Sequence, residues 1–188
     1  LLAQSWIRQE QPHFNYILGL HKRQLDQKRF KTVVFDYDHP DQLSVQLQNV
    51  KADIVINCIG LTSVEACEEH PKLAEKVNVE LSKNIALACA KSKVKLVHIS
   101  TDHLFDGTLP FANETTSKSP VNNYGKTKGE GEEVVQQTNT DALLIRTNFF
   151  GWGPAYKASF SDQILKNLVN GLTSKLFKDV YYTPISVV

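Results

Sequence analysis

Short apolar runs of strand type alternate with stretches of helical period along this chain of 188 residues. The run at 53–59 (DIVINCI) is apolar almost throughout, as expected of a strand that is buried on both faces of a sheet. Further runs of this kind lie at 15–20, 31–35, 95–101 and 142–147. Strands that alternate with helices form βαβ units, which have parallel strands and right-handed crossovers. The sequence therefore predicts an α/β fold with a parallel sheet.

Three helices can be predicted from the intervals between these runs. The first follows Pro71, a residue favoured at helix starts, and carries apolar residues on one face. The second begins near Asn123. The third is expected to be capped by Ser159 or Ser161 and to end at Gly171.

A change of composition near 149 predicts a boundary between a domain at 1–148 and a smaller segment at 149–188. The chain contains no methionine, begins in a helical pattern and ends on an apolar stretch, which is the pattern expected of a fragment. The loop at 106–121 is long, and loops of that length in compact domains are often functional.

Composition narrows the classes of function. A formal net charge of +1 argues against a protein that binds nucleic acid by bulk charge. No apolar run approaches the ~20 residues of a membrane span, so no membrane partner is expected. Three cysteines without a CxxC pair indicate a reducing cytoplasm, and the Cys67–His70 pair has no second pair at zinc-like spacing, so no metal site is expected.

The strongest local signal for chemistry is the segment from Tyr124 to Lys128 (YGKTK). In a helix these two residues are four apart and share one face. A nearby ammonium group favours the phenolate and should lower the pKa of Tyr124 from its usual value near ~10. Such a tyrosine can exchange a proton with a substrate oxygen near neutral pH. The alternative is an exposed helix start that carries an incidental tyrosine and lysine.

Ser100, Thr101 and Asp102 follow the predicted strand at 95–99. Ligands of open α/β sheets bind at the carboxyl ends of the strands, where a hydroxyl group can donate a hydrogen bond to a substrate carbonyl. Simple termination of the strand, with a turn at Asp102, would explain the same residues.

Four segments in order resemble the extended short-chain dehydrogenase/reductases, and among them the dTDP-4-dehydrorhamnose reductases and related sugar-nucleotide reductases. They are VINCIGLTSVEACEEHP, KLVHISTDHLFDGT, SPVNNYGKTKGEGE and LLIRTNFFG. The resemblance covers roughly 14–188 and is densest at 53–151. It implies a Rossmann-type doubly wound parallel sheet with the start of a substrate-binding segment. Relative to that fold the chain is truncated, because the first strand and the glycine-rich turn that holds the pyrophosphate are absent.

The resemblance also implies roles for individual residues. A catalytic trio is expected at Thr101, Tyr124 and Lys128. The last two of these would also touch the cofactor, together with Asp36 near the adenine and Cys58, Ile59 and Gly60 along the cofactor backbone. The expected substrate-binding residues are Thr62, Glu65, His103, Asn148 and Phe149.

Some of these positions have another interpretation or depart from the family pattern. Asp36 would serve equally to end a strand or cap a turn, and Arg146 to form a structural ion pair. His103 and Glu65 stand where the reductases usually have tyrosine and aspartate, so the identity of the sugar stays open.

The expected activity is NAD(P)H-dependent reduction of a nucleotide-linked 4-keto-6-deoxy sugar. A homodimer is the one assembly considered, and the oligomeric state stays open. Lys22 and Arg23 follow the strand at 15–20, where a cation accommodates the 2′-phosphate of NADP, so NADP(H) is preferred over NAD(H). A solvated basic turn is the alternative for this pair. Two alternatives to the function remain, an epimerase or dehydratase of the same superfamily and a non-catalytic subunit like the methionine adenosyltransferase beta subunit.

Overall fold

The computed structural model describes residues 2–8, 13–20, 30–153, 158–176, 178 and 184–187. Contacts divide the chain into two compact units. The larger unit is Tyr16–Arg146, and the smaller unit combines Leu1–Asn15 with Thr147–Val188. Each unit is described by itself. The predicted division into functional domains at 148 stays a prediction, because compactness does not test which part binds which ligand.

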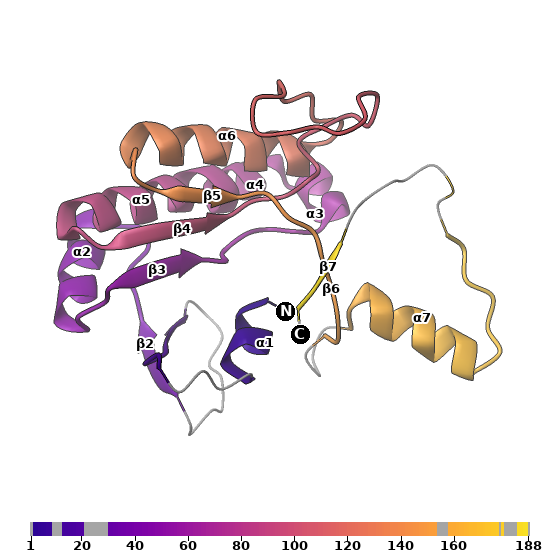
Figure 1. Cartoon of the computed structure of the whole chain (residues 1–188), viewed down its shortest axis with the longest axis horizontal. Helices are drawn as coiled ribbons and strands as arrows, with labels where there is room; N and C mark the ends of the chain where they lie inside the picture. The colour runs from indigo at the N-terminus through magenta and orange to yellow at the C-terminus, as the bar shows by residue number, and fades with distance from the viewer. Residues whose placement is uncertain are drawn as a thin grey trace. The chain divides into compact units, whose positions relative to one another are not determined.

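Five short strands form the sheets of the larger unit (Figure 1). β1 (Ile17–Leu20) pairs with β2 (Lys31–Val34), and both run parallel. β4 (Lys95–Ile99) lies between β3 (Ile54–Asn57) and β5 (Leu143–Ile145), again with parallel pairing. The prediction of an α/β fold with parallel strands is therefore confirmed.

The five strands form two separate sheets of two and three strands. No described strand joins β1 to β3 by hydrogen bonds, and this is the place where the family resemblance puts its first strand. Within the larger sheet, Ile56 of β3 lies opposite Val97 of β4, which lies opposite Leu143 of β5. This register brings the carboxyl ends of β3, β4 and β5 to one edge.

The larger unit contains both of the helices predicted for it, the first with an interruption, and also α2 and α3, which were not predicted. The helix after Pro71 is not continuous, because a π-helical turn divides it and places Asn78 in the interior. Such turns occur often at functional sites. The elements are α2 (Pro40–Asn49), α3 (Val64–Glu69), α4 (Pro71–Glu75), the π-helical turn η1 (Lys76–Glu80), α5 (Leu81–Ser92) and α6 (Asn123–Thr138).

The core of the larger unit lies between the three-stranded sheet and the layer of α5 and α6 (Figure 1). Leu96 of β4, Ile85 of α5 and Val135 of α6 are all buried there. On the opposite face of the sheet, Ile54 and Ile56 are 50% and 41% exposed. Burial of one face therefore fixes the position of α6, which carries two of the predicted site residues.

The smaller unit contains two helices and a short parallel ribbon. Ser159 caps α7 through a reciprocal capping box with Asp162, which selects it over Ser161 as the N-cap. Gly171 follows at φ +64°, in the left-handed region, as expected after a helix end. The elements are α1 (Leu2–Arg8), β6 (Phe149–Phe150), α7 (Phe160–Val169) and β7 (Ile185–Ser186).

Two glycines of α6 give a prediction about packing. A Cβ atom at Gly131 would collide with the backbone oxygen of Asn78, whereas one at Gly129 would lie 3.3 Å from the flexible Lys118 side chain. Gly131→Ala is therefore expected to destabilise the fold by about 1–3 kcal/mol. Gly129→Ala should be neutral or stabilising, because alanine favours a helix over glycine by ~1 kcal/mol. Denaturant unfolding measures both, and equal effects would contradict the predicted close approach.

Candidate functional site

The site lies at the carboxyl end of β4. The strand ends at Ile99, and the buried Ser100 and Thr101 follow it directly. The Thr101 hydroxyl donates to a carboxylate oxygen of Asp102 at 3.3 Å and accepts from the backbone N–H of His103 at 3.2 Å. The side chain of Thr101 is thus held at the strand edge where ligands of parallel sheets bind.

Tyr124 stands in the first turn of α6, and two groups outside the helix fix that turn. The side chain of Asn122, the N-cap, accepts from the backbone N–H of Gly125 at 2.8 Å. Glu68 of α3 accepts two hydrogen bonds from Asn123, one from its backbone N–H and one from its side-chain amide, both at 2.7 Å. These bonds satisfy N–H groups that a helix start leaves without partners.

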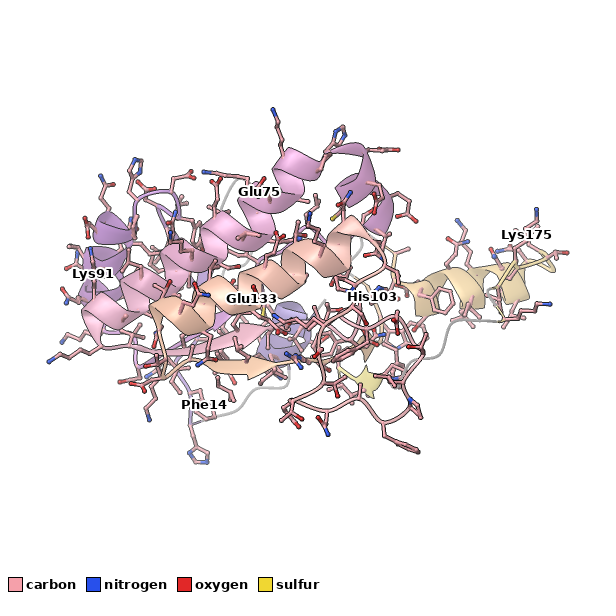
Figure 2. The ribbon with its side chains drawn as sticks, turned by 90° about the horizontal axis from the view of Figure 1, so that it is seen from above. Phe14, Glu75, Lys91, His103, Glu133 and Lys175 are labelled. Atoms are coloured by element: carbon pink, nitrogen blue, oxygen red, sulfur yellow. The ribbon has the colours of Figure 1, made fainter. Side chains whose placement is uncertain are left out.

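Thr101 and Tyr124, 23 positions apart in sequence, meet in the folded chain. The Thr101 side chain lies close enough to the Tyr124 phenol to lower its pKa. The ring of His103 packs edge-on against the ring of Tyr124, with 5.4 Å between the centroids, beside the start of α6 (Figure 2). Gly125 permits this approach, because a Cβ atom there would collide with the backbone oxygen of His103.

Burial raises the pKa of Tyr124, and the nearby Thr101 hydroxyl acts in the opposite direction without overcoming it. The expectation that Lys128 lowers this pKa is wrong for the described site. Lys128 does lie one turn after Tyr124, as the spacing predicts, but its Nζ donates to the backbone oxygen of Ile99 at 2.7 Å. The phenol therefore remains protonated at neutral pH, which is the form that can donate a proton.

Lys128 is only 4% exposed. Burial lowers its pKa to about 8, and the nearby carboxylate of Glu132 acts in the opposite direction. A lysine buried at the edge of a parallel sheet is suited to hold a polar ligand group, because a desolvated cation interacts strongly with oxygen acceptors.

The segment after β3 is held against α6 by Asn78, which is fully buried. The Asn78 side chain accepts from the N–H of Leu61 at 2.8 Å and donates to the Leu61 oxygen at 3.2 Å. It also donates to Thr127 of α6 at 3.0 Å. The structure thereby holds Cys58, Ile59 and Gly60 at the carboxyl end of β3, on the same edge as Thr101.

Three further predicted residues, Thr62, Glu65 and Asp36, lie in segments that follow β3 and β2. Thr62 is exposed. Glu65 lies in the first turn of α3, where a backbone hydrogen bond and the bond from Ser63 lower its pKa. Asp36 follows β2 and accepts from the backbone N–H groups of Asp38 and His39, so it does cap a turn. Its predicted position near an adenine stays a prediction.

The roles expected for the other four site residues stay predictions. Asn148 and Phe149 belong to the smaller unit, where the Asn148 oxygen accepts from Ile185 and β6 pairs with β7. Lys22 and Arg23 lie outside the described residues.

Three residues that position the site were not predicted. Asn78 is a polar residue on a helix of otherwise apolar spacing, and Glu132 follows Lys128 by one helical turn, so both had a signal in the sequence. No pattern in the sequence indicated the two hydrogen bonds of Glu68 to Asn123, because these residues are 55 positions apart.

These groups fit one end of a dinucleotide. A buried cation, a phenol and a hydroxyl converge at the carboxyl edge of β4, where the ribose and nicotinamide would lie beside Lys128 and Tyr124. No described residue forms a glycine-rich turn for the pyrophosphate. The described part of the chain also has no cluster of three or more His, Cys, Asp or Glu that could hold a metal ion.

A family model described as the RmlD substrate binding domain matches residues 17–188. The chain belongs to this family. The match of the RmlD domain includes the three central residues of the site as well as the smaller unit from Thr147 onward.

Several known proteins have sequences similar to that of this chain. The "Probable low-salt glycan biosynthesis reductase Agl14" of Haloferax volcanii is 35% identical over 143 residues, or 73% of this chain and 47% of that protein. The dTDP-4-dehydrorhamnose reductase of Salmonella typhimurium is 32% identical over 152 residues, or 79% and 50%. The methionine adenosyltransferase 2 subunit beta of Xenopus laevis is 37% identical over 100 residues, or 53% and 30%.

Solved structures agree with the RmlD fold. A hypothetical dTDP-4-dehydrorhamnose reductase from Sulfolobus tokodaii matches 99% of this chain and 64% of its own, with a TM-score of 0.83 and 29% identity. The dTDP-4-dehydrorhamnose reductase of Bacillus anthracis, solved in complex with NADP, matches 76% and 52%, with a TM-score of 0.64 and 26% identity. The chain spans about half the length of the curated reductases it matches. Its described residues include no helix that is long and apolar enough to cross a membrane.

Proposed function

We propose that this chain is the cofactor-binding part, with the start of the substrate-binding part, of an NADPH-dependent reductase. Its substrate would be a 4-keto-6-deoxy sugar linked to a nucleotide. The proposal rests on one observation. Thr101, Tyr124 and the buried Lys128 converge at the carboxyl edge of β4. Membership of the RmlD family and the similarity to dTDP-4-dehydrorhamnose reductases support the substrate class.

Each of the three residues has a distinct task in this proposal. The Tyr124 phenol, kept protonated by its raised pKa, donates a proton to the substrate oxygen. The Thr101 hydroxyl orients that oxygen. Lys128 holds the ribose hydroxyls and contributes positive charge where negative charge develops. When bound, the cofactor supplies the hydride.

To test the proposal, the protein is mixed with NADPH, a dTDP-4-keto-6-deoxy sugar is added, and the loss of NADPH absorbance is followed. Equimolar formation of NADP and of the 4-hydroxy sugar supports a reductase. Conversion of the sugar without net consumption of NADPH would indicate an epimerase or a dehydratase instead.

A second candidate is a non-catalytic subunit, because methionine adenosyltransferase 2 subunit beta of Xenopus laevis is 37% identical over 100 residues. Retention of the trio Thr101, Tyr124 and Lys128 favours catalysis over this role. Co-purification of the protein with a methionine adenosyltransferase, together with absence of NADPH turnover on any keto-sugar, would establish the second candidate.

The choice of cofactor gives a further prediction. Lys22 and Arg23 follow β1, and in a dinucleotide fold the end of that strand lies beside the adenosine ribose. If they bind the 2′-phosphate of NADPH, replacing both with serine should lower the preference for NADPH over NADH at least about tenfold, since one charge-assisted hydrogen bond contributes roughly 1.5–3 kcal/mol.

Dissociation constants of both cofactors, measured by fluorescence titration, decide this prediction. A matched control replaces Lys72 and Lys83, which are exposed on α4 and α5, and removes the same charge. An equal loss for NADPH and NADH, or a wild type that already prefers NADH, would exclude Lys22 and Arg23 from the cofactor site.

A further inference from the structure

Glu132 is a buried carboxylate for which the proposed chemistry has no direct use. It follows Lys128 by one turn of α6 and is 2% exposed. A buried charge is costly unless it is paired and hydrogen-bonded. Burial, the largest single effect, would raise the pKa of Glu132, but the combined effects of Arg146, Ser100 and the Lys118 charge outweigh it and hold the pKa below its ordinary value. The side chain is therefore a permanent anion next to the site.

Two cations from distant parts of the chain reach this anion. Arg146, which follows β5, donates to Glu132 through Nε at 3.0 Å and through Nη2 at 2.9 Å, in a bidentate pair. Lys118 lies near the end of the long loop, with its Nζ 3.6 Å from the Glu132 carboxylate. Lys118 also donates to the backbone oxygen of Gly129 at 2.8 Å, so it is bound to α6 at more than one point.

These contacts hold both ends of the segment 106–118. At its beginning, the guanidinium carbon of Arg146 lies 5.7 Å from the centroid of the Phe105 ring. At its end, Lys118 contacts Glu132, and the N–H of Ser119 donates to the Leu104 oxygen at 2.8 Å. The bond between Leu104 and Ser119 closes the stem of the loop. His103, whose ring packs on Tyr124, comes one residue before this stem.

We propose that Glu132 is a positioning residue of the site: through Arg146 and Lys118 it fixes the stem of the 106–118 loop against α6, and with its charge it holds Lys128 as a cation. The role at Lys128 rests on the proposed function, whereas the role at the loop does not.

The electrostatic environment of Lys128 supports this assignment. The titratable groups near its ammonium are Glu132 on α6, His98 on β4 and Cys58 after β3. Burial lowers the pKa of His98 to about 3, so His98 is uncharged at neutral pH. Burial raises the pKa of the Cys58 thiol to about 11, so Cys58 is uncharged as well. Glu132 is therefore the charged group of these three that opposes the loss of the Lys128 proton at neutral pH.

Glu132→Gln tests both effects, because it removes the charge and preserves the shape. The matched control is Glu133→Gln, which breaks the 2.9 Å ion pair of the same Lys118 with a carboxylate that is 60% exposed. The first measurement is an NMR titration of ¹³C-labelled lysine in the full chain, with the Lys128 signal assigned by its absence from a Lys128→Met sample. The pKa of Lys128 should fall by about one unit in Glu132→Gln, the size of effect expected for a neighbouring opposite charge. It should not change in Glu133→Gln.

The second measurement is amide hydrogen exchange at Ser119. Protection of this N–H should fall at least about tenfold in Glu132→Gln if the stem opens locally, and stay as in wild type in Glu133→Gln. An unchanged Lys128 pKa together with unchanged Ser119 protection in Glu132→Gln would overturn the proposal. If Glu132→Gln does not fold, Lys118→Met must show the same loss of Ser119 protection, and an unchanged amide there would equally overturn it. Neither measurement needs substrate or cofactor, so a failed reductase assay does not affect the result.

Discussion

Tyr124→Phe is expected to lower turnover by a factor on the order of 10²–10⁴ while the affinity for NADPH stays near that of wild type. The substitution removes only the phenol oxygen, and general acid catalysis by a positioned side chain contributes a rate factor of about this size. Burial raises the pKa of the phenol and so keeps it protonated beside Thr101, where a substrate oxygen would accept its proton.

The measurement is single-turnover reduction of the keto-sugar, with cofactor affinity taken from fluorescence titration. Tyr16→Phe is the matched control, since Tyr16 precedes β1, which belongs to a different sheet from β4, and packs on Phe30. Because the protonated phenol is the active form, the contribution of Tyr124 to the rate should be lost only as the pH rises through its raised pKa, above the pH at which Lys128 loses its charge. A Tyr124→Phe variant with the wild-type rate at saturating substrate would remove Tyr124 from the mechanism.

Lys128→Met is expected to impair both turnover and cofactor binding, each by at least about tenfold, because one buried ammonium serves both. This double effect separates it from Tyr124→Phe. Burial lowers the pKa of Lys128 to about 8, so its charge is present below that pH and is lost as the pH rises through it. Cofactor affinity of the wild-type protein should therefore decline as the pH rises through about 8.

Isothermal titration calorimetry of cofactor binding between about pH 6 and about pH 10 measures this decline. These limits lie roughly two pH units below and above the pKa of Lys128. The Lys128→Met variant should show weak binding that does not depend on pH over the same range. Full affinity in Lys128→Met, with only the rate reduced, would show that the lysine acts on the phenol alone.

Apolar periodicity alone located all five strands of the larger unit to within about two residues at each end, because strand burial is a local property of the chain. The same holds for the start of α6 at Asn123. The division of the helix after Pro71 by a π turn was not predictable, because it depends on Asn78 finding partners in Leu61 and Thr127.

The site shows the same limit. The spacing predicted that Tyr124 and Lys128 share one face of a helix, and the end of the strand predicted that Thr101 lies at the sheet edge. These three residues do converge in the structure. The direction of the Tyr124 pKa was predicted wrongly, because it depends on how deeply the phenol is buried and on which acceptor the lysine finds. Neither is encoded within a few residues of Tyr124.

The hydrogen bonds of Glu68 to Asn123 and of Asn78 to Thr127 have a consequence for the order of folding. Each closes a chain segment of about fifty residues, and the entropy of such closure is lost before the contact forms. We therefore expect the first turn of α6 to gain these partners late, after α5 and β4, which lie within both closed segments, have formed. The phenol and the ammonium of the site would thus be brought together among the last events of folding, and a partly folded chain would carry α6 without a working edge at β4.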